Sequence, residues 1–366
     1  MAYDLDPKNL AVFCGSLRNV SSAEVVLFMN APVSQRALEI TRRYDVNVQV
    51  FDVQGLPHDM QSFHPSTSRW KLIYDFMAPD QTRRRYRRVW MVDARDTFFQ
   101  KDPFEMLPLD KEAFYVFTGV ESVLIRDDGW NKGWIKDCFS DDIYRLVADK
   151  HIICSGVSMG SVDAVLRYLD LMNDVVTGQR RSEISKNSRF PHCERNGVDQ
   201  GVHNVLVYTA GLPNLRVFDQ SRGPVANMQA RKAIVKGIEV RNEAGERVAV
   251  VHQYDRNAVL QKNLFRRFVY WTNTDDLSEE WKLEKACSSF SYVMDKDLLK
   301  GNCDLSASGG AASASTCCKI CKDTSACKSF VYYSGMCFLK SCKTQTGALN
   351  GVNLVGAVTG VTLSRK

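Results

Sequence analysis

The stretch of sequence that decides the fold is Tyr86-Arg87-Arg88-Val89-Trp90-Met91-Val92-Asp93-Ala94-Arg95-Asp96-Thr97-Phe98-Phe99-Gln100. Its first half is a short apolar run, which is typical of a buried strand in an α/β protein. Two acids, Asp93 and Asp96, follow that strand directly. Because ligands of open α/β sheets bind at the carboxyl ends of strands, the sequence predicts a functional site here.

Apolar runs and helical patterns alternate on both sides of this strand up to about residue 280, as they do in βαβ units with parallel strands. The fold class expected for this part is therefore α/β. Ser161 is expected to cap the helix that follows it. We expect strands at 24–29, 46–53, 88–92, 114–118, 156–160 and 248–252, and helices at 34–44, 66–77, 140–149 and 161–177.

Two carboxylates at one strand end suit a divalent metal ion. Hard cations such as Mn²⁺ and Mg²⁺ prefer carboxylate oxygens, and as Lewis acids they neutralise the charge of a diphosphate leaving group. The alternative is that Asp93 and Asp96 only cap a turn, a position where aspartate is common.

The run Val-Asp-Ala-Arg-Asp-Thr-Phe-Phe-Gln-Lys-Asp-Pro-Phe (92–104) resembles the Asp-x-Asp region of GT-A glycosyltransferases, in the branch that has Asp-x-Arg-Asp followed by Phe-Gln-x-Asp-Pro-Phe. Three further segments, at 154–160, 199–204 and 251–256, are similar in order and spacing to motifs of glycogenin-like, family 8-type enzymes. The resemblance covers about residues 10–270. It implies a GT-A (Rossmann-like) mixed sheet flanked by helices, and a metal-dependent transfer of sugar from a nucleoside-diphosphate donor to a glycan or glycoprotein acceptor.

The same resemblance implies roles for individual residues. It implies that Mn²⁺ or Mg²⁺ is held by Asp93, Asp96 and His252, that the nucleotide sugar contacts Asp93, Arg95, Ser155, Gly156 and Arg69, and that Asp199 and Gln200 act near the transferred sugar.

Four of these residues also have a structural interpretation. His252 follows the apolar run 248–251, so it lies at a strand end where a neutral imidazole can bind metal, but such a histidine is otherwise a structural hydrogen-bonding residue. Asp199 precedes a helical pattern and is alternatively an N-cap. Gly156 is alternatively a close backbone approach, and Arg69 a solvated helix arginine.

The chain departs from the family pattern in two places. Arg95 stands where the second acid often stands, so either Asp96 is the second metal ligand or it contacts ribose. Arg95 itself pairs either with a phosphate or with Asp96. The strand that precedes the first helix (9–17) in this family is not found in residues 1–8, so we expect the chain to be truncated or a fragment.

Charge and hydropathy argue against a nucleic-acid-binding or membrane-spanning protein. The 366 residues carry a formal net charge of +6, a mild excess that does not by itself indicate nucleic-acid binding. The basic run Arg83–Arg88 is interpreted as a solvated turn before the strand; binding of nucleic acid or an anionic membrane is the alternative, which neither interleaved aromatic residues nor a second basic patch supports. No stretch of about 18 apolar residues is present, so no membrane span is expected, and the N-terminus lacks a signal pattern.

Cysteine usage sets the tail apart. Of 12 cysteines, eight lie between Cys287 and Cys342, which favours a disulfide framework over zinc because only one Cys-x-x-Cys pair is present. Segment 317–341 resembles the PAN/Apple module, so residues 287–366 are expected to form a small disulfide-rich α+β domain that tethers substrate or is an inert appendage. We expect a helix at 316–322, strands at 328–333 and 337–339, and an oxidising compartment (secretory pathway, Golgi lumen or extracellular space). The scattered cysteines are expected to be buried small apolar residues: Cys14, Cys138, Cys154 and Cys193.

Three functions are therefore compared. The first is a GT-A transferase in residues 1–280 that uses a nucleotide sugar. The second is a catalytically inactive carbohydrate- or protein-binding protein with a degenerate transferase domain. The third is a metal-dependent phosphohydrolase, which is disfavoured because no histidine-rich or second acidic metal site accompanies Asp93 and Asp96.

Overall fold

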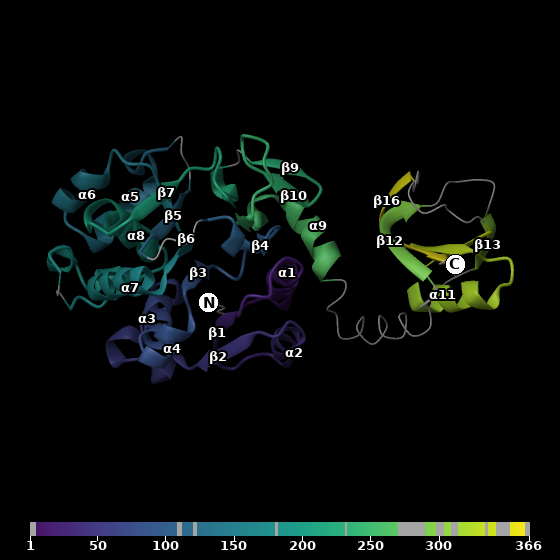
Figure 1. Ribbon diagram of the computed structural model, residues 1–366, viewed down its shortest axis with the longest axis horizontal. Helices are drawn as coiled ribbons and strands as arrows, with labels where there is room; N and C mark the ends of the chain where they lie inside the picture. Colours follow the sequence, from purple (N-terminus) through teal and green to yellow (C-terminus); the bar gives the residue numbers. More distant parts are fainter. Residues whose placement is uncertain are drawn as a thin grey trace. The chain divides into compact units, whose positions relative to one another are not determined.

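The computed structural model describes residues 5–107, 112–119, 123–179, 182–230, 233–269, 290–297, 304–308, 314–333, 336–341 and 352–362. The chain divides into two compact units, residues 1–268 and 269–366 (Figure 1). Each unit is described separately below. The assignment of 1–280 and 287–366 as functional domains stays a prediction.

The first unit is a mixed α/β structure, which confirms the predicted fold class. Its main sheet has the strand order β3-β6-β5-β7. β6 runs antiparallel to both of its neighbours, whereas β5 and β7 are parallel, so the sheet is mixed and not parallel throughout. As a result the first residues of β6 lie beside the carboxyl end of β3. The strands are β3 (Arg88–Val92), β6 (Ile153–Ser161), β5 (Phe114–Thr118) and β7 (Leu215–Phe218).

Three smaller sheets complete the part of this unit that the structure describes. β1 (Val26–Asn30) and β2 (Asn47–Phe51) form a parallel pair. β11 (Val250–His252) lies between β4 (Thr97–Phe99), to which it is antiparallel, and β8 (Val225–Asn227), to which it is parallel. β9 (Ile234–Lys236) and β10 (Glu239–Arg241) form a hairpin.

Helices surround these sheets (Figure 1). The predicted cap is confirmed, because the Ser161 hydroxyl accepts from the backbone N–H of Ala164 at 3.2 Å. The α-helices are α1 (Pro7–Arg18), α2 (Gln35–Arg43), α3 (Pro65–Met77), α4 (Asp80–Arg85), α5 (Gly129–Cys138), α6 (Asp141–Val147), α7 (Val162–Val176), α8 (Val198–Thr209) and α9 (Ala258–Phe268). Short 3₁₀ turns lie at Val53–Gly55, His58–Met60, Pro103–Glu105, Ile125–Asp127, Ser185–Asn187, His192–Glu194, Met228–Ala230 and Tyr254–Arg256.

The core beneath the main sheet is built on aromatic contacts. Tyr168 of α7 stacks on Phe114 of β5 with ring centroids 4.7 Å apart, and its edge meets Trp70 of α3 at 5.8 Å. All three side chains are at most 1% exposed. Aromatic pairs in such geometries add to the stabilisation from area burial, so α3 and α7 are held against the sheet.

Two of the scattered cysteines are not free, contrary to our expectation. Cys138 at the end of α5 and Cys193 form a disulfide that closes a 55-residue separation. The two Cα atoms lie 4.8 Å apart because α5 packs beside the turn at 192–194. This contact joins segments distant in the chain, so a local sequence pattern does not predict it. Cys14 and Cys154 are free and buried, as predicted.

The described residues of the second unit form a five-stranded antiparallel sheet of order β12-β16-β14-β15-β13 and the helix α11. Disulfides join Cys317 to Cys337 and Cys321 to Cys327, and Cys318 is disulfide-bonded as well, so the predicted disulfide-rich character is confirmed. Cys287, Cys303 and Cys342 lie outside the described residues, and the PAN/Apple assignment stays a prediction. The elements are β12 (Phe290–Asp297), β13 (Asp304–Ser308), α11 (Ala314–Asp323), β14 (Ser329–Tyr333), β15 (Met336–Lys340) and β16 (Val352–Thr362).

Disulfides in both units indicate an oxidising compartment. Within the described part of the chain, no helix combines the length and the apolar character that a membrane crossing requires.

Candidate functional site

Three potential metal ligands converge from different parts of the first unit. Asp93 follows β3, Asp96 precedes β4, and His252 ends β11, where it pairs in register with Thr97. The Nε2 atom of His252 lies 3.4 Å from Asp96 Oδ1 and 3.7 Å from Asp93 Oδ2. One ligand atom from each residue falls within 4.8 Å of the others, which is compact enough for a single ion.

Each carboxylate uses its other oxygen to bind an arginine. Asp93 Oδ1 accepts from Arg69 Nη1, and Asp96 Oδ2 accepts from Arg95 Nη2 at 2.8 Å. The two remaining oxygens are therefore turned towards His252. Asp96 Oδ1 is buried and accepts no hydrogen bond from any described residue, a costly state that a bound cation would relieve.

Asn227, at the end of β8, fixes the orientation of the imidazole. Its Nδ2 donates to the carbonyl oxygen of Thr118 at 2.7 Å, so its Oδ1 is the atom that faces His252 Nδ1 at 2.8 Å. An amide oxygen only accepts, so Nδ1 carries the proton and the lone pair lies on Nε2, towards the carboxylates. The Cys154 thiol also lies 3.4 Å from Nδ1. Sequence reasoning missed Asn227, because the pairing of β8 with β11 that brings it to His252 joins residues distant in the chain.

Gly156 leaves the space that this cluster occupies. A Cβ atom at position 156 would lie 2.4 Å from His252 Cε1, 2.5 Å from His252 Nε2 and 2.9 Å from Asp93 Oδ2. The same residue is anchored by its carbonyl oxygen, which accepts from Asp93 N at 2.9 Å. Close backbone approach, the structural interpretation of this glycine, therefore serves the cluster itself.

The electrostatics of the cluster favour a positive charge at its centre. Burial raises the pKa of Asp93, but the Arg69 guanidinium and His252 together outweigh burial and hold that pKa well below the ordinary value. Burial lowers the pKa of His252, whereas Cys154, Asp96 and Asp93 together raise it well above the ordinary value. The carboxylates thus attract either a proton on Nε2 or a metal ion in its place.

Arg69 of α3 bridges two acids. Its side chain lies over Trp70, 4.4 Å from the ring centroid, and its Nη2 donates to Asp199 Oδ2 at 2.8 Å while Nη1 binds Asp93. Arg69 is 8% exposed, so its interpretation as a solvated helix residue is wrong. The predicted contact of Arg69 with a diphosphate stays a prediction.

Asp199 lies in the first turn of α8 and is 3% exposed. The N-cap interpretation of Asp199 is wrong, because Gly197, in the left-handed region at φ 83°, occupies the cap position. Burial raises the pKa of the Asp199 carboxyl, and Asp93 adds to this, against the lowering effect of Arg69. A buried acid with a perturbed pKa beside a possible metal cluster is a candidate catalytic group.

Gln200 and Ser155 contact each other. Gln200 Oε1 accepts from the backbone N–H of Ser155 at 2.8 Å, and Gln200 Nε2 donates to the carbonyl oxygen of Ile153. Asn204 binds the backbone of Ile153 as well, with Oδ1 2.8 Å from its nitrogen. These amides hold the start of β6 in place, and with it the segment that carries Gly156.

Arg95 lies at the rim of the site with 58% of its side chain exposed. It pairs with Asp96 and lies 3.6 Å from Asp255, so of its two predicted partners the carboxylate is the one that it contacts. Contact with a phosphate stays a prediction. All nine residues singled out from the sequence therefore lie within one continuous network: Arg69, Asp93, Arg95, Asp96, Ser155, Gly156, Asp199, Gln200 and His252.

No protein-family model and no curated protein matches this chain. Among solved structures, the apo structure of the WbbM bifunctional glycosyltransferase is similar at 13% sequence identity and a TM-score of 0.41. The match covers 74% of this chain and 49% of that one, so the chain spans about half the length of that structure. At this identity and TM-score the likeness is not a basis for assigning an activity.

Proposed function

We propose that the protein is a metal-dependent glycosyltransferase that moves a sugar from a nucleoside-diphosphate donor to a glycan or glycoprotein acceptor. The observation that carries the proposal is the convergence of Asp93, Asp96 and His252, with the buried Asp96 Oδ1 left without a hydrogen-bond donor among the described residues. The motif resemblance supplies the reaction class.

The donor set fits the proposed metal. Two carboxylates and one neutral imidazole suit Mn²⁺ or Mg²⁺ better than a soft metal, which would select thiolates. When bound, the ion would supply Lewis-acid stabilisation of the diphosphate leaving group. Asp93, Asp96 and His252 would hold it, with Asn227 keeping the His252 lone pair on Nε2.

The other residues of the network would bind and orient the donor. Arg95 is exposed at the rim, where a guanidinium suits a phosphate. The Arg69 guanidinium binds both Asp199 and Asp93, so these two acids lie close together. Asp199 and Gln200 would act near the transferred sugar. Ser155 and Gly156 would line the donor, since Gly156 is the point where backbone comes nearest to the cluster.

The finer parts of the proposal follow the resemblance. The first unit is proposed to be a GT-A domain of the glycogenin-like type. Residues 287–366 are proposed to be a PAN/Apple-like module that tethers substrate. The secretory pathway or Golgi lumen is the proposed compartment, consistent with disulfides in both units.

The test is Mn²⁺-dependent hydrolysis of a panel of nucleoside-diphosphate sugars. Asp96→Ala and His252→Ala each remove a ligand, and a loss of several kcal/mol of transition-state stabilisation corresponds to about 100-fold or more in rate. Asp75→Ala is the matched control, because this exposed acid on α3 pairs only on the surface with Lys71. Its rate should equal that of the wild type.

The outcomes separate the competing functions. Absence of both turnover and nucleotide binding by the wild type, measured by calorimetry with Mn²⁺ present, would support the catalytically inactive binding protein. Hydrolysis of simple phosphate monoesters that is stronger than hydrolysis of nucleotide sugars would support the phosphohydrolase.

A further inference from the structure

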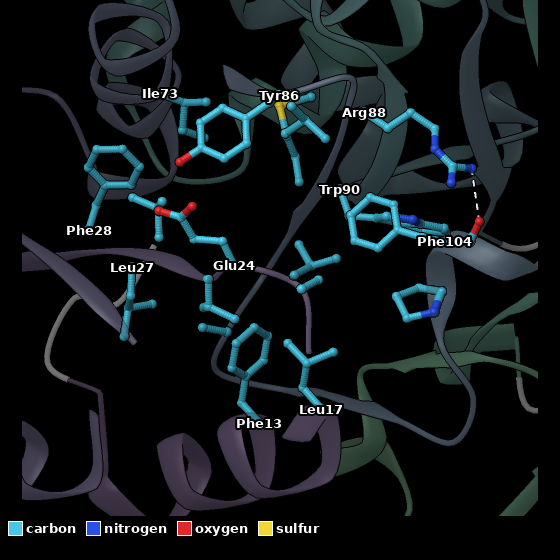
Figure 2. A pocket seen from close by; sticks show the side chains of 18 of the residues that line it. Phe13, Leu17, Glu24, Leu27, Phe28, Ile73, Tyr86, Arg88, Trp90 and Phe104 are labelled. Atoms are coloured by element: carbon cyan, nitrogen blue, oxygen red, sulfur yellow. Dashed lines mark hydrogen bonds between the residues drawn. The ribbon is translucent and has the colours of Figure 1, made fainter. Parts of the chain in front are cut away.

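Trp130 is the tryptophan that the described part of the chain leaves open to solvent. It is the second residue of α5 and is 70% exposed. Trp70, by contrast, is 1% exposed, and Trp90, which lines the apolar pocket in Figure 2, stacks on an aromatic ring of β5 with 5.5 Å between the ring centroids. Tryptophan is highly buried on average, so the fold does not use the free face of Trp130 for its own packing.

Trp130 lies against Trp134, one turn further along the same face of α5, and we call the two residues the tryptophan pair. Their ring centroids are 5.9 Å apart, with 34° between the ring planes. Trp134 packs on the start of α8, because a Cβ atom at Gly197 would lie 2.3 Å from its Cε2 and one at Gly201 would lie 3.0 Å from its Cβ. Two glycines one turn apart therefore let Trp134 lie directly on α8. The tryptophan pair is thus carried by a contact between two helices and not by a loop.

The tryptophan pair is connected to the candidate functional site through Asn131, the residue after Trp130. Asn131 is buried, and its Oδ1 accepts from Gln200 Nε2 at 3.3 Å. Gln200 Oε1 in turn accepts from the backbone N–H of Ser155 at 2.8 Å. Two side-chain contacts therefore join the first turn of α5 to the start of β6, beside the carboxylate cluster.

The starts of α5 and α8 lie at the edge of the main sheet that carries the carboxylate cluster. Thr118 at the end of β5 pairs with Ile153 at the start of β6, and α5 follows β5 in the chain. The turn ahead of α5 is tied to the segment ahead of β6, because Ile125 N donates to Lys150 O at 2.9 Å. α8 carries Asp199 in its first turn. The tryptophan pair is therefore placed to contact the outer part of a ligand that reaches the cluster.

The charged residues next to Trp130 in the chain balance one another. Arg126 and Lys132 are positive, and Asp127 and Asp128 are negative. Their formal charges sum to zero, so this surface does not select an anion. Such side chains can donate hydrogen bonds to hydroxyl groups and accept hydrogen bonds from them. An uncharged ligand that is rich in hydroxyl groups suits this combination of an open indole and a polar, neutral surround.

A sugar ring has the matching chemistry. One face of a pyranose presents C–H groups, which are apolar and slightly positive, and the face of an indole is slightly negative. The hydroxyl groups at the edge of the sugar then point towards polar neighbours. A protein partner fits less well, because a stable interface buries about 800 Å² on each side. Two aromatic side chains bury only about 150–250 Å² each.

We propose that Trp130 is the stacking surface of an acceptor subsite, on which a sugar ring of an uncharged oligosaccharide lies, and that Trp134 is the positioning residue that holds it. The rim suits the acceptor, because the diphosphate of the donor is proposed to lie at the carboxylate cluster. The word acceptor rests on the proposed function. Binding of the oligosaccharide to Trp130 requires neither metal nor donor, so it is measured without them.

The test is binding of the full chain to an array of short uncharged oligosaccharides without metal or nucleotide. Trp130→Ala should lower the affinity for the bound oligosaccharide by about tenfold or more, the scale of one lost stacking contact. Trp130→Phe keeps an aromatic face and should lose less. Val217→Ala on β7 is the control, because it shortens another exposed apolar side chain (48% exposed) and should bind as the wild type does. Urea unfolding checks that each variant is folded.

Quenching of tryptophan fluorescence by acrylamide tests the same contact and needs only the conservative variant. In the wild type, the bound oligosaccharide should reduce the quenching, because it covers the indole of Trp130. In Trp130→Phe, the same oligosaccharide at a saturating concentration should leave the quenching unchanged. In a transfer assay, Trp130→Ala should raise the KM for the acceptor and leave the KM for the donor as it is in the wild type.

Three results would overturn the proposal. The first is that the wild type binds no uncharged oligosaccharide on the array. The second is equal affinity of wild type and Trp130→Ala for every oligosaccharide that the wild type binds. The third is reduced acrylamide quenching with a nucleoside diphosphate alone, which would assign Trp130 to the donor. Oligosaccharide binding that Trp130→Ala loses, in a protein without Mn²⁺-dependent turnover, would reject the transferase and leave the sugar-binding role of Trp130 in place.

Discussion

Asn227 Oδ1 lies 2.8 Å from His252 Nδ1, and Asn227 cannot rotate away because its Nδ2 donates to Thr118 O at 2.7 Å. The amide thereby fixes which imidazole nitrogen faces the two carboxylates. Asn227→Ala should lower the Mn²⁺ affinity by about 10- to 100-fold, the usual effect of removing a partner that orients a metal-binding histidine. Isothermal titration calorimetry measures the Mn²⁺ affinity of the variant and of the wild type.

Gln220→Ala is the control for that experiment. Gln220 Nε2 donates to the same Thr118 carbonyl oxygen at 3.3 Å, so the substitution Gln220→Ala disturbs the same strand end as Asn227→Ala. Because Asn227 still orients His252 in this variant, its Mn²⁺ affinity should stay near the wild-type value. Equal affinities for wild type and Asn227→Ala would show that the tautomer is not set by this amide.

Gly156→Ala should abolish Mn²⁺ binding and lower the free energy of unfolding by about 1–3 kcal/mol, because its Cβ would overlap the His252 ring. Calorimetry with Mn²⁺ and urea unfolding are the measurements. Gly133→Ala in α5 is the matched change, since nothing lies within 4 Å of its Cβ position. Alanine there should stabilise the helix by up to about 1 kcal/mol. Normal metal binding by Gly156→Ala would contradict the proposed position of the ion.

Arg69→Ala should lower the free energy of unfolding by about 3–5 kcal/mol, because it leaves the buried Asp199 and its neighbour Asp93 without their shared cation. Arg83→Ala is the control: it removes the ion pair with Asp163, which at 2.7 Å is about as short as the Arg69–Asp199 pair at 2.8 Å. The side chains of Arg83 and Asp163 are 51% and 66% exposed. That change should cost about 1 kcal/mol or less. Urea denaturation compares the two, and equal effects would mean that Arg69 does not stabilise the buried acids.

His203 should make stability depend on pH. Burial, with a smaller effect of Arg69, lowers the pKa of His203 to about 3, and its Nδ1 lies 2.7 Å from the Tyr168 hydroxyl. The ordinary value in the unfolded chain is about 6.5. The stability that the neutral ring contributes is therefore complete above about pH 6.5 and is lost as the pH falls towards 3, at about 1.4 kcal/mol per pH unit.

His203→Gln should remove that part of the pH dependence. The difference in unfolding free energy between wild type and variant should change by about 1.4 kcal/mol per unit between pH 6 and pH 4, measured by urea unfolding. The same substitution at the exposed His151 is the control and should keep the wild-type slope. Parallel curves for wild type and His203→Gln would contradict the prediction.

Local patterns predicted the elements that have continuous apolar sequence. The predicted strands 88–92 and 114–118 coincide with β3 and β5. β6 begins at Ile153, earlier than the predicted Gly156, because the polar Ser155 interrupts the apolar run although it is buried. α5 was missed, since Gly129 and Gly133 weaken its helical pattern and packing against α8 stabilises it.

The sequence by itself determined the α/β class of the first unit, the disulfide-rich tail, and the candidates Asp93, Asp96 and His252. These three features follow from the spacing of apolar residues and cysteines in short segments and from the residue types at strand ends. Only the tertiary structure decided the antiparallel entry of β6, the Cys138–Cys193 disulfide, the pairing of Arg69 with two acids, and the contact of Asn227 with His252. Each of these joins residues that are distant in the chain. Such contacts are set by strand register and helix packing, which a local pattern does not encode.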